Sequence, residues 1–390
     1  MKVVIVGGGP SGLYLGLLLK RHQRSWQVDV IEQNGSNSTF GFGVALADTG
    51  LLQLQEADRS SYTALCAAMH YSERQVIVHR ETPIEYTLNV KSGAIPRLKL
   101  LQILEAEAQS AGVRIFFGKR IESSDDLGRL GLGDADVVVG ADGVNSVIRR
   151  QFAVQFGASQ RLLTNHFAWY GTKRVFDASG IVFRQYQGGH FVAHYYAYAD
   201  QMSTFVAECD DSTWQRLKLA SITDDERQAL FETLFANELV NEPLISNHSV
   251  WRQFPVIRST HWVHDRYVLI GDALASAHFS IGSGTRIAMT DSIALAQALL
   301  QCSGNVGAGL KAFERNHAPQ KEKLISASEQ SFMWYERIAE WMDKLTPEEL
   351  VYQFMTRTGR ISDGRLRNEF PDLMRRLGAN AKVRQALSGG

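Results

Sequence analysis

The pattern of apolar and polar positions at the start of the chain predicts a strand, a turn, a helix and a second strand. Residues 2–6 and 28–32 are short apolar runs, which are typical of buried strands. Residues 13–22 are largely apolar as far as Lys20 and predict a helix. The intervening residues 7–12 are rich in glycine and favour a turn. We therefore expect a βαβ unit here.

The segments up to residue 140 alternate between helical and extended patterns. The elements expected there are a helical stretch over residues 48–70, strands over 75–79 and 85–90, a helix over 98–110, and strands over 113–117 and 136–140. The last two strands follow a helix, so we expect them to return to the sheet of the first unit.

The hydrophobic pattern changes from about residue 166 to residue 209, where aromatic side chains occupy alternating positions. Such alternation predicts an antiparallel sheet with one face against a core. The elements expected from here on are strands over residues 181–186, 190–198 and 203–208, a helix over 224–238 with an acidic first turn, a strand over 267–270, and two long helices within 285–328.

Composition limits the kinds of partner and the cellular compartment that we expect for this protein. The chain has 41 Lys+Arg and 41 Asp+Glu, so no net charge favours nucleic acid or an anionic membrane, and a small molecule is the expected partner. Cys66, Cys209 and Cys302 are far apart, which predicts no metal site and no disulfide framework. No cleavable apolar leader and no stretch of about 20 apolar residues is visible, so we expect a cytoplasmic protein without a membrane span.

The glycine-rich turn has the spacing of a dinucleotide-binding loop. Gly7 suits the tight turn, Gly9 lets backbone N–H groups approach a pyrophosphate, and Gly12 lets the helix pack closely on the strand. Glu32 lies 20 residues after Gly12 at the end of the second strand, where a carboxylate can accept hydrogen bonds from a ribose. A structural glycine turn is the alternative. The turn does not separate FAD from NAD.

Two later segments favour FAD. The strand over 136–140 is followed by Asp142-Gly143, and this segment matches the DG motif of flavoprotein hydroxylases, although a capped turn is the alternative. The strand over 267–270 ends in Gly271-Asp272, whose carboxylate can hold ribityl hydroxyls. The helix that follows residues 282–285 can direct its N–H groups and positive dipole end at the flavin pyrimidine. The expected cofactor contacts are Gly7, Gly9, Pro10, Ser11, Gly12, Glu32, Gly43, Arg97, Asp142, Gly143, Gly271, Asp272, Gly282, Gly284 and Thr285.

On these segments the chain resembles the group A flavoprotein monooxygenases with the p-hydroxybenzoate hydroxylase fold, over essentially its whole length. Within that family it is similar to the monooxygenase portion of the salicyloyl-CoA 5-hydroxylase and anthraniloyl-CoA (2-aminobenzoyl-CoA) monooxygenase type. It is also similar to the tryptophan-derivative hydroxylase of violacein biosynthesis. The runs that carry the resemblance are TFGFGV at 39–44, the stretch 273–285 with HFSIGSGT, residues 332–336 with 356–357, and WYGT at 169–172.

Two positions depart from the commoner pattern of the family. Most members have proline where this chain has Phe279, and Gln-Gly where it has Ser283-Gly284. The CoA-ester enzymes also carry a further reductase-like domain, whereas this sequence stops at Gly390, so we expect no second reduction step.

The resemblance implies an α/β fold in which a Rossmann-like FAD-binding domain is interleaved with an antiparallel-sheet substrate domain and followed by C-terminal helices. The division expected is an FAD-binding domain of residues 1–72, 95–160 and 266–330, a substrate domain of 73–94 and 161–265, and a C-terminal helical region of 331–390.

The resemblance also implies the reaction. NADH or NADPH reduces the flavin, O₂ adds to form a flavin hydroperoxide, and oxygen passes to an electron-rich ring. His278, His194 and Tyr196 are candidate catalytic residues, with a structural histidine and ordinary sheet packing as alternatives. Phe42, Trp169, Tyr170 and Phe279 are candidate substrate contacts, with core packing as the alternative.

The expected substrate is a salicylate- or anthranilate-like ring, carried by CoA or by an acyl or peptidyl carrier protein. Residues 351–390 hold eight Lys/Arg against three acids, a face that could bind such a carrier or could simply be solvated. A free indole or amino-acid-derived aromatic is the alternative substrate. A flavin dehydrogenase or reductase, and a non-catalytic binding protein, are the alternative functions.

Overall fold

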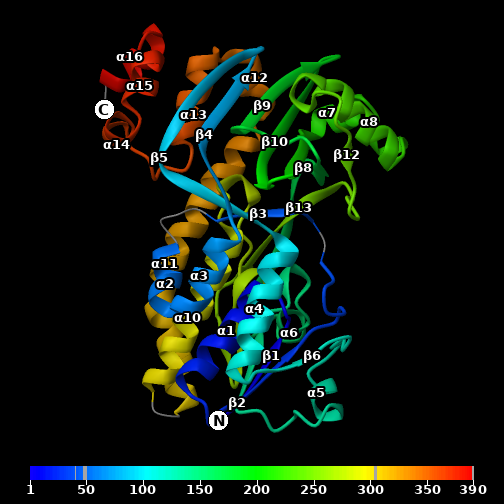
Figure 1. Ribbon diagram of the computed structural model, residues 1–390, viewed down its shortest axis with the longest axis vertical. Coiled ribbons are helices and arrows are strands. Elements are labelled where there is room, and N and C mark those ends of the chain that lie inside the picture. The colour runs from blue at the N-terminus through cyan, green and yellow to red at the C-terminus, as the bar shows by residue number, and fades with distance from the viewer. Residues whose placement is uncertain (40, 47–50, 303–304, 389–390) are drawn as a thin grey trace.

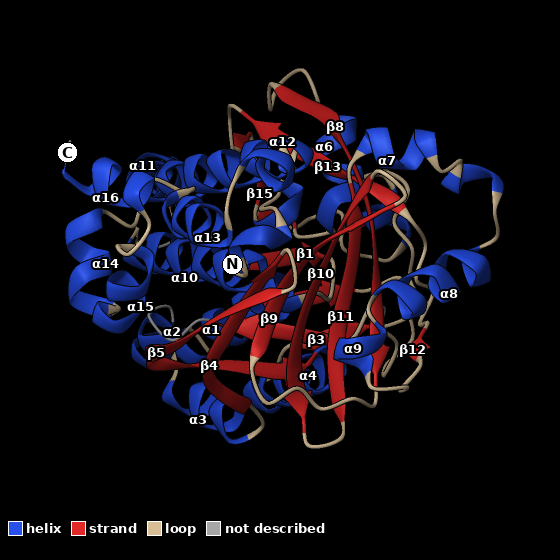
Figure 2. Ribbon diagram, turned by 90° about the horizontal axis from the view of Figure 1, so that it is seen from above, coloured by secondary structure: helices blue, strands red, loops and turns tan. Residues whose placement is uncertain are grey.

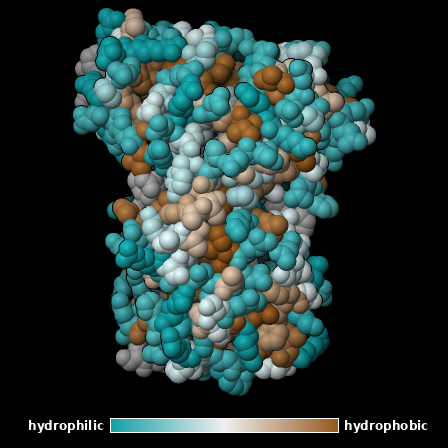
Figure 3. All heavy atoms as spheres, in the orientation of Figure 1, coloured by the Kyte–Doolittle hydropathy of each residue, from teal (hydrophilic) through white to brown (hydrophobic). Residues whose placement is uncertain are grey.

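The protein is elongated, with a lower half and an upper half joined at a narrower waist (Figure 1). This computed structural model describes residues 1–39, 41–46, 51–302 and 305–388. Phe40, within one of the family-like runs, and Asp48, at the start of an expected helix, lie outside the described residues. In the space-filling view, apolar side chains gather near the waist, while polar ones dominate both ends (Figure 3).

The lower half is built on a six-stranded sheet in the order β14-β15-β7-β1-β2-β6. Its strands are β1 Lys2–Val6, β2 Gln27–Ile31, β6 Arg114–Phe116, β7 Val137–Gly140, β14 Val263–His264 and β15 Tyr267–Leu269. All the pairs are parallel except β14 with β15. The central strands β1 and β7 are almost wholly apolar and buried, as is typical of parallel strands that are covered on both faces. Helix α1 (Pro10–His22) packs against α4 (Arg97–Ala111) and α10 (Gly284–Gln301).

The upper half is built on a nine-stranded sheet in the order β12-β8-β11-β10-β9-β4-β5-β3, with β13 also paired to β8. Its strands are β3 Gly43–Leu46, β4 His70–His79, β5 Thr82–Pro96, β8 Ala158–Thr172, β9 Ser179–Tyr186, β10 Gly189–Ala199, β11 Met202–Cys209, β12 Leu244–Ile245 and β13 Arg252–Ser259. Only β4 and β9 are parallel neighbours among these strands. The expected antiparallel sheet is therefore confirmed, and it also takes up the short strand β3 from near the N-terminus.

The two faces of the upper sheet bury different helices, because successive side chains on a strand point to opposite sides. Phe191 and Phe205 pack on one side against α7 (Asp211–Arg216), α8 (Asp224–Leu234) and α9 (Ala236–Leu239). Phe183 and Val192 pack on the other side against the C-terminal helices. These are α12 Ile338–Lys344, α13 Pro347–Thr356, α14 Asp363–Glu369, α15 Pro371–Leu377 and α16 Ala381–Ser388. Figure 2 shows the two helical groups on opposite sides of the strands.

One long helix, α11 (Val306–Tyr335), connects the halves. It packs along α10 in the lower half and ends beside the upper sheet (Figure 1). The remaining elements are α2 Leu51–Ala57, α3 Arg59–Ala67, α5 Asp126–Arg129, α6 Val147–Gln151, and the 3₁₀ turns η2 Gly143–Asn145, η3 Leu219–Ser221, η4 Gly271–Ala273 and η5 Phe279–Ile281. None of the helices in the described part of the chain is long and apolar enough to cross a membrane.

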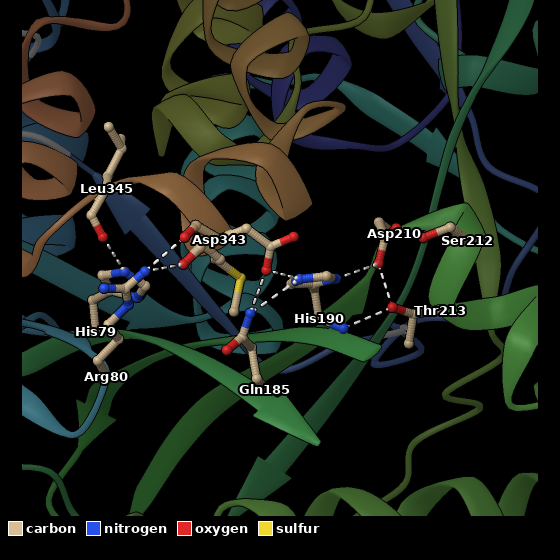
Figure 4. A network of polar contacts seen from close by, with 10 residues as sticks. His79, Arg80, Gln185, His190, Asp210, Ser212, Thr213, Asp343 and Leu345 are labelled. Atoms are coloured by element: carbon tan, nitrogen blue, oxygen red, sulfur yellow. Dashed lines mark hydrogen bonds and ion pairs between the residues drawn. The ribbon is translucent and has the colours of Figure 1, made fainter. Parts of the chain in front are cut away.

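A polar network holds α12 against the upper sheet (Figure 4). Nε2 of His190 lies 2.8 Å from Oδ1 of Asp343 on α12, and the His190 amide donates to Oγ1 of Thr213 on α7 over 2.7 Å. Arg80 donates to the Asp343 carbonyl over 2.7 Å. These bonds tie the end of α12 to the upper sheet.

Candidate active site

The three glycines of the first loop differ in what surrounds them. Gly7 has φ +112°, and a Cβ on it would lie 2.3 Å from the Ala141 carbonyl oxygen. A Cβ on Gly12 would lie 2.0 Å from the Gly7 carbonyl oxygen, so α1 packs directly on the turn. A Cβ on Gly9 would meet nothing within 4 Å. The loop thus leaves open space beside Gly9, at the start of α1, where anions bind.

Pro10 and Ser11 open helix α1 behind this space. Pro10 occupies the first turn of α1. Backbone N–H groups in a first turn form no intrahelical hydrogen bond, so the N–H that proline lacks is not needed there. Ser11 is buried and its hydroxyl lies 3.0 Å from the position of a Cβ on Gly271. The first loop and the Gly271-Asp272 turn are therefore neighbours, although 260 residues separate Ser11 from Gly271.

Glu32 borders the same loop from the end of β2. Its carboxylate accepts hydrogen bonds from the Gly8 amide and the Asn34 amide, each over 2.8 Å. The side chain keeps part of its surface accessible. A carboxylate at this place can accept a hydrogen bond from a ribose hydroxyl instead of one from a backbone amide.

The Asp142-Gly143 segment forms the next part of the cofactor region. Oδ2 of Asp142 accepts from the Val147 amide over 2.7 Å, while Oδ1 is buried without a hydrogen-bond partner among the described residues. Burial raises the pKa of this carboxyl. Arg149 donates to the Ala273 carbonyl over 3.0 Å and so ties this segment to the Gly271-Asp272 turn. A buried acceptor without a partner is unusual and indicates a donor from outside the chain.

Asp272 lies within the electrostatic influence of several cations. Its side chain is accessible to solvent although protein surrounds it, and this enclosure raises the pKa of its carboxyl. Lys321 and Arg97 oppose that rise by their charge. Arg97 starts α4, and its Nε donates to Oγ1 of Thr39 over 3.2 Å. Burial lowers the pKa of the Arg97 guanidinium.

A buried ion cluster lies behind this turn. Oδ2 of Asp291 on α10 accepts from the Gly271 amide over 2.8 Å and lies 2.5 Å from Nζ of Lys321 on α11. Oδ1 of Asp291 lies 2.9 Å from Nε2 of His317. Asp291 and Lys321 are completely buried. The charge of Lys321 and the bond from His317 lower the pKa of Asp291, against the opposing effect of burial.

Gly282 and Gly284 precede α10. Gly282 has φ +58°, and a Cβ on it would meet nothing within 4 Å. A Cβ on Gly284 would meet only the Ala277 carbonyl oxygen, at 3.6 Å. No side chain caps this helix start, where Thr285 lies in the first turn. The first-turn N–H groups can therefore point at a ligand.

These features fit FAD. Open positions at Gly9, Gly143 and Gly282, the unpartnered oxygen of Asp142, and the accessible Asp272 come from three distant segments. Gly43 does not share this openness. A Cβ on it would lie 2.5 Å from the Tyr198 ring, and its amide donates to Oγ1 of Thr204 over 2.9 Å. The absence of a side chain at Gly43 is explained by close strand packing.

His278 lies at the junction of the two halves, one residue before η5. Its Nδ1 accepts from the Ser280 amide over 3.2 Å, so the neutral ring carries its proton on Nε2. Burial, with the charges of His194 and Arg357, lowers the pKa of His278 to about 3. The His278 amide donates to Oγ of Ser328 on α11 over 2.8 Å. His278 is therefore neutral at physiological pH.

His194 on β10 is paired with a carboxylate that the sequence did not single out. Its Nε2 lies 3.1 Å from Oε2 of Glu208 on β11. Oε1 of Glu208 accepts from Nδ2 of Asn165 over 3.0 Å. Glu208 is 1% exposed. In the sequence, the only indication of this pair was that Glu208 is a charged residue near the end of an apolar strand.

An aromatic cluster connects the two histidines. The Phe279 ring centroid lies 5.3 Å from Trp169, 5.7 Å from His194 and 4.1 Å from His278. Trp169 and Phe279 both keep accessible surface. Phe42, also partly accessible, lies against Gly171, where a Cβ would be 2.4 Å from its ring. The candidates Trp169, Phe279, Phe42 and His194 thus come together on one face of the upper sheet.

Two other candidates do not join this cluster. Tyr170 points to the opposite face, where it is 1% exposed and its hydroxyl accepts from Nε1 of Trp251 over 3.0 Å. Its place in the core does not support the expected role as pocket wall. The Tyr196 hydroxyl donates to the Gly43 carbonyl over 2.9 Å, and burial raises the pKa of Tyr196 to about 12. This bond gives Tyr196 a structural partner on β3.

The basic residues near the C-terminus are largely engaged within the protein. Arg365 pairs with Glu369 and Arg375 with Asp372. Arg376 donates to the Pro83 carbonyl over 2.8 Å. These contacts favour the solvated-face interpretation of the basic C-terminal segment.

Comparisons with known proteins agree with the geometry. A family model described as FAD binding domain matches residues 1–328. The chain is 33% identical to salicyloyl-CoA 5-hydroxylase of Streptomyces sp, over 92% of this chain and 70% of that protein. It is 32% identical to protodeoxyviolaceinate monooxygenase of Chromobacterium violaceum, over 92% and 94%. It is 31% identical to 3-hydroxy-4-methyl-anthranilyl-[aryl-carrier protein] 5-monooxygenase of Streptosporangium sibiricum, over 93% and 95%.

A solved structure supports the fold. The crystal structure of 2-methyl-3-hydroxypyridine-5-carboxylic acid oxygenase superposes with a TM-score of 0.72 at 18% identity, over 91% of this chain and 98% of that one. Because the family model spans most of the chain and three monooxygenases or hydroxylases are at least 31% identical to it, the chain belongs to the FAD-binding-domain family as a flavin-dependent aromatic monooxygenase.

Proposed function

We propose that this monooxygenase hydroxylates a salicylate- or anthranilate-like ring, carried as a thioester on CoA or a carrier protein. NADH or NADPH serves as reductant and O₂ as co-substrate. The observation that carries the proposal is the His194–Glu208 pair, 3.1 Å apart beside the accessible rings of Trp169 and Phe279. A base next to an aromatic wall suits a ring that bears a hydroxyl or amino group.

Glu208 and His194 act as a unit in this proposal. A carboxylate can only accept, so Nε2–H of His194 donates to Glu208, and Nδ1 is left as the basic nitrogen. Nδ1 accepts the proton of a ring hydroxyl or amine as that group donates electrons to the ring. Glu208 stabilises the imidazolium that forms and keeps the ring oriented.

His278 contributes a fixed donor. Its Nδ1 is occupied by Ser280, so Nε2–H is the group that it offers to a ligand. The lowered pKa keeps it neutral, and it therefore adds no charge near His194. A neutral donor orients an acceptor without competing for the proton that His194 takes.

The aromatic wall excludes water from the reacting ring. Phe42, Trp169 and Phe279 offer apolar faces against which an aromatic substrate can stack. When bound, FAD supplies the oxygen-transferring chemistry. In this proposal, residues 1–72, 95–160 and 266–330 form the cofactor domain, and residues 73–94 and 161–265 form the substrate domain.

The thioester form is supported by two relatives, whose names specify a CoA ester and a carrier-bound ring. A free indole-derived or amino-acid-derived aromatic is the second candidate, because the protodeoxyviolaceinate monooxygenase is nearly as similar.

The test is a screen of purified, FAD-loaded protein with NADH or NADPH in air. The probes are salicylate and anthranilate as free acids, as CoA esters and as carrier-bound thioesters, together with indole derivatives. Faster pyridine-nucleotide oxidation and an ¹⁸O-labelled product from ¹⁸O₂ are expected with a thioester. If no thioester gives labelled product, the thioester proposal fails, and labelled product from an indole derivative would favour the second candidate.

A further inference from the structure

Arg252 lies on the same sheet face as the aromatic cluster. It begins β13 opposite Phe167 of β8, and its guanidinium carbon is 5.6 Å from the Phe167 ring centroid and 6.0 Å from that of Trp169. Phe167 in turn lies 4.8 Å from Phe279, centroid to centroid. A row of aromatic rings therefore leads from Arg252 to the two histidines.

The charge of Arg252 is not compensated. Among the described residues, no carboxylate or carbonyl forms an ion pair or hydrogen bond with its guanidinium. The side chain remains accessible, yet surrounding protein lowers its pKa, and no neighbouring acid acts in the other direction. Arg184, in contrast, is paired with Glu238 over 2.9 Å. Arg252 is thus an accessible guanidinium that lies over aromatic rings and has no acidic partner in the described part of the chain, so its N–H groups can donate to an acceptor on a ligand.

We propose that Arg252 binds the acyl oxygen of the substrate and thereby sets which ring carbon faces the cofactor. The proposal rests on the proposed function, because it assumes an aromatic ring stacked along Trp169 and Phe279. With the ring there, an acyl group directed toward β13 reaches the guanidinium. The guanidinium group presents several N–H donors in one plane, which suits an oxygen acceptor with two lone pairs.

Two substrate forms share this chemistry. A free acid offers a carboxylate, and a thioester offers a carbonyl oxygen with a partial charge. Charge-assisted hydrogen bonds are about twice as strong as neutral ones. Loss of Arg252 should therefore weaken binding of the carboxylate form more than binding of the thioester form, and the form that the unaltered enzyme binds more tightly is the one that the site favours.

The experiment uses the FAD-loaded variants Arg252→Met and Arg252→Lys. Arg161→Met is the matched control, because Arg161 is also exposed and stacks over a phenylalanine, 5.3 Å from the Phe332 centroid. Dissociation constants are measured from the change in flavin absorbance for salicylate, anthranilate and their CoA esters. Phenol and aniline, which have the ring but no acyl group, are measured alongside.

Removing the charge should weaken binding of the favoured acyl-bearing probe by about 10- to 100-fold and leave phenol and aniline within about twofold. Arg252→Lys should restore part of the affinity. With a turned-over probe, Arg252→Met should also raise the share of NADH oxidation that gives no hydroxylated product.

Equal losses for acyl-bearing and acyl-free probes would overturn the proposal and indicate a packing role for Arg252. Unchanged binding of every probe would also overturn it, as would failure of all four acyl-bearing probes to bind the unaltered enzyme. Binding is measured without turnover, so a screen that finds no hydroxylated product rejects the proposed function while these dissociation constants still decide the role of Arg252.

Discussion

Nε2 of His194 lies 3.1 Å from Oε2 of Glu208 across neighbouring strands, and the carboxylate is almost completely buried. A buried carboxylate costs free energy unless its oxygens are paired, and here both are, with His194 and Asn165. The pair gives the proposed base a fixed tautomer and a fixed orientation, which a lone histidine on the same strand would lack.

Glu208→Gln keeps the volume and an acceptor for His194 but removes the charge that stabilises the imidazolium. We expect kcat for hydroxylation to fall by about 10- to 100-fold, and His194→Ala to cost at least as much. The measurement is product formation under saturating substrate, with FAD affinity recorded alongside. Glu85→Gln, at an exposed ion pair with Arg74, is the control. Unchanged kcat in both site variants would exclude the pair from the chemistry.

The first glycine loop should separate cofactor binding from folding. In Gly9→Ala the new methyl group enters the open space, so apoprotein stability should be unchanged while the FAD dissociation constant rises by about tenfold or more. In Gly12→Ala the methyl group would meet the Gly7 carbonyl oxygen at 2.0 Å, so the apoprotein itself should be destabilised. Thermal melts of apoprotein and FAD fluorescence titrations distinguish the two effects. Equal melting points for both variants would contradict this division.

The buried ion cluster should behave as a coupled unit. Lys321→Met leaves the Asp291 charge without its cation and should destabilise the protein by about 3 to 5 kcal/mol. Adding Asp291→Asn removes the orphaned charge, so the double variant should lose less than the sum of the single losses. Urea unfolding of the four proteins gives the coupling free energy. Strictly additive losses would show that the two side chains do not stabilise each other.

His278 should make stability fall as the pH falls. Its pKa is lowered to about 3 in the folded protein, whereas an unfolded chain titrates near the ordinary value of 6.5. Between these values the unfolded state binds the proton and the folded state does not, so the contribution is complete above about pH 6.5 and is lost toward lower pH. From pH 7 to pH 5, the stability advantage of the unaltered protein over His278→Gln should shrink by about 1 to 2 kcal/mol. Urea unfolding at the two pH values measures this gap, and a constant gap would contradict the lowered pKa.

Much of the lower half was predictable because its signals are local. The βαβ start, the strand ending in Gly271 and the two long helices follow from short-range patterns, and all are present. Gly7 and Gly12 were also assigned correctly to the turn and the helix packing, since backbone geometry within a few residues decides both.

The upper half was less predictable because strand order and side-chain direction are long-range properties. Adjacent Trp169 and Tyr170 were both expected in the pocket, yet alternation along β8 sends Tyr170 to the opposite core. Gly43 is expected at the cofactor, and the structure adds that β3 joins the upper sheet, where Gly43 packs closely against Tyr198. Neither outcome depends on the neighbouring sequence alone.

Turns, helix starts and strand ends are encoded within a few consecutive residues, so the sequence was enough to identify the family and to predict the cofactor segments. Only the tertiary structure decided which side chains share the site. It brought His194 to Glu208 through the pairing of β10 with β11, and it left Arg252 beside Trp169 without an acidic partner. Such contacts depend on strand register, which is fixed when the whole sheet packs against its two cores.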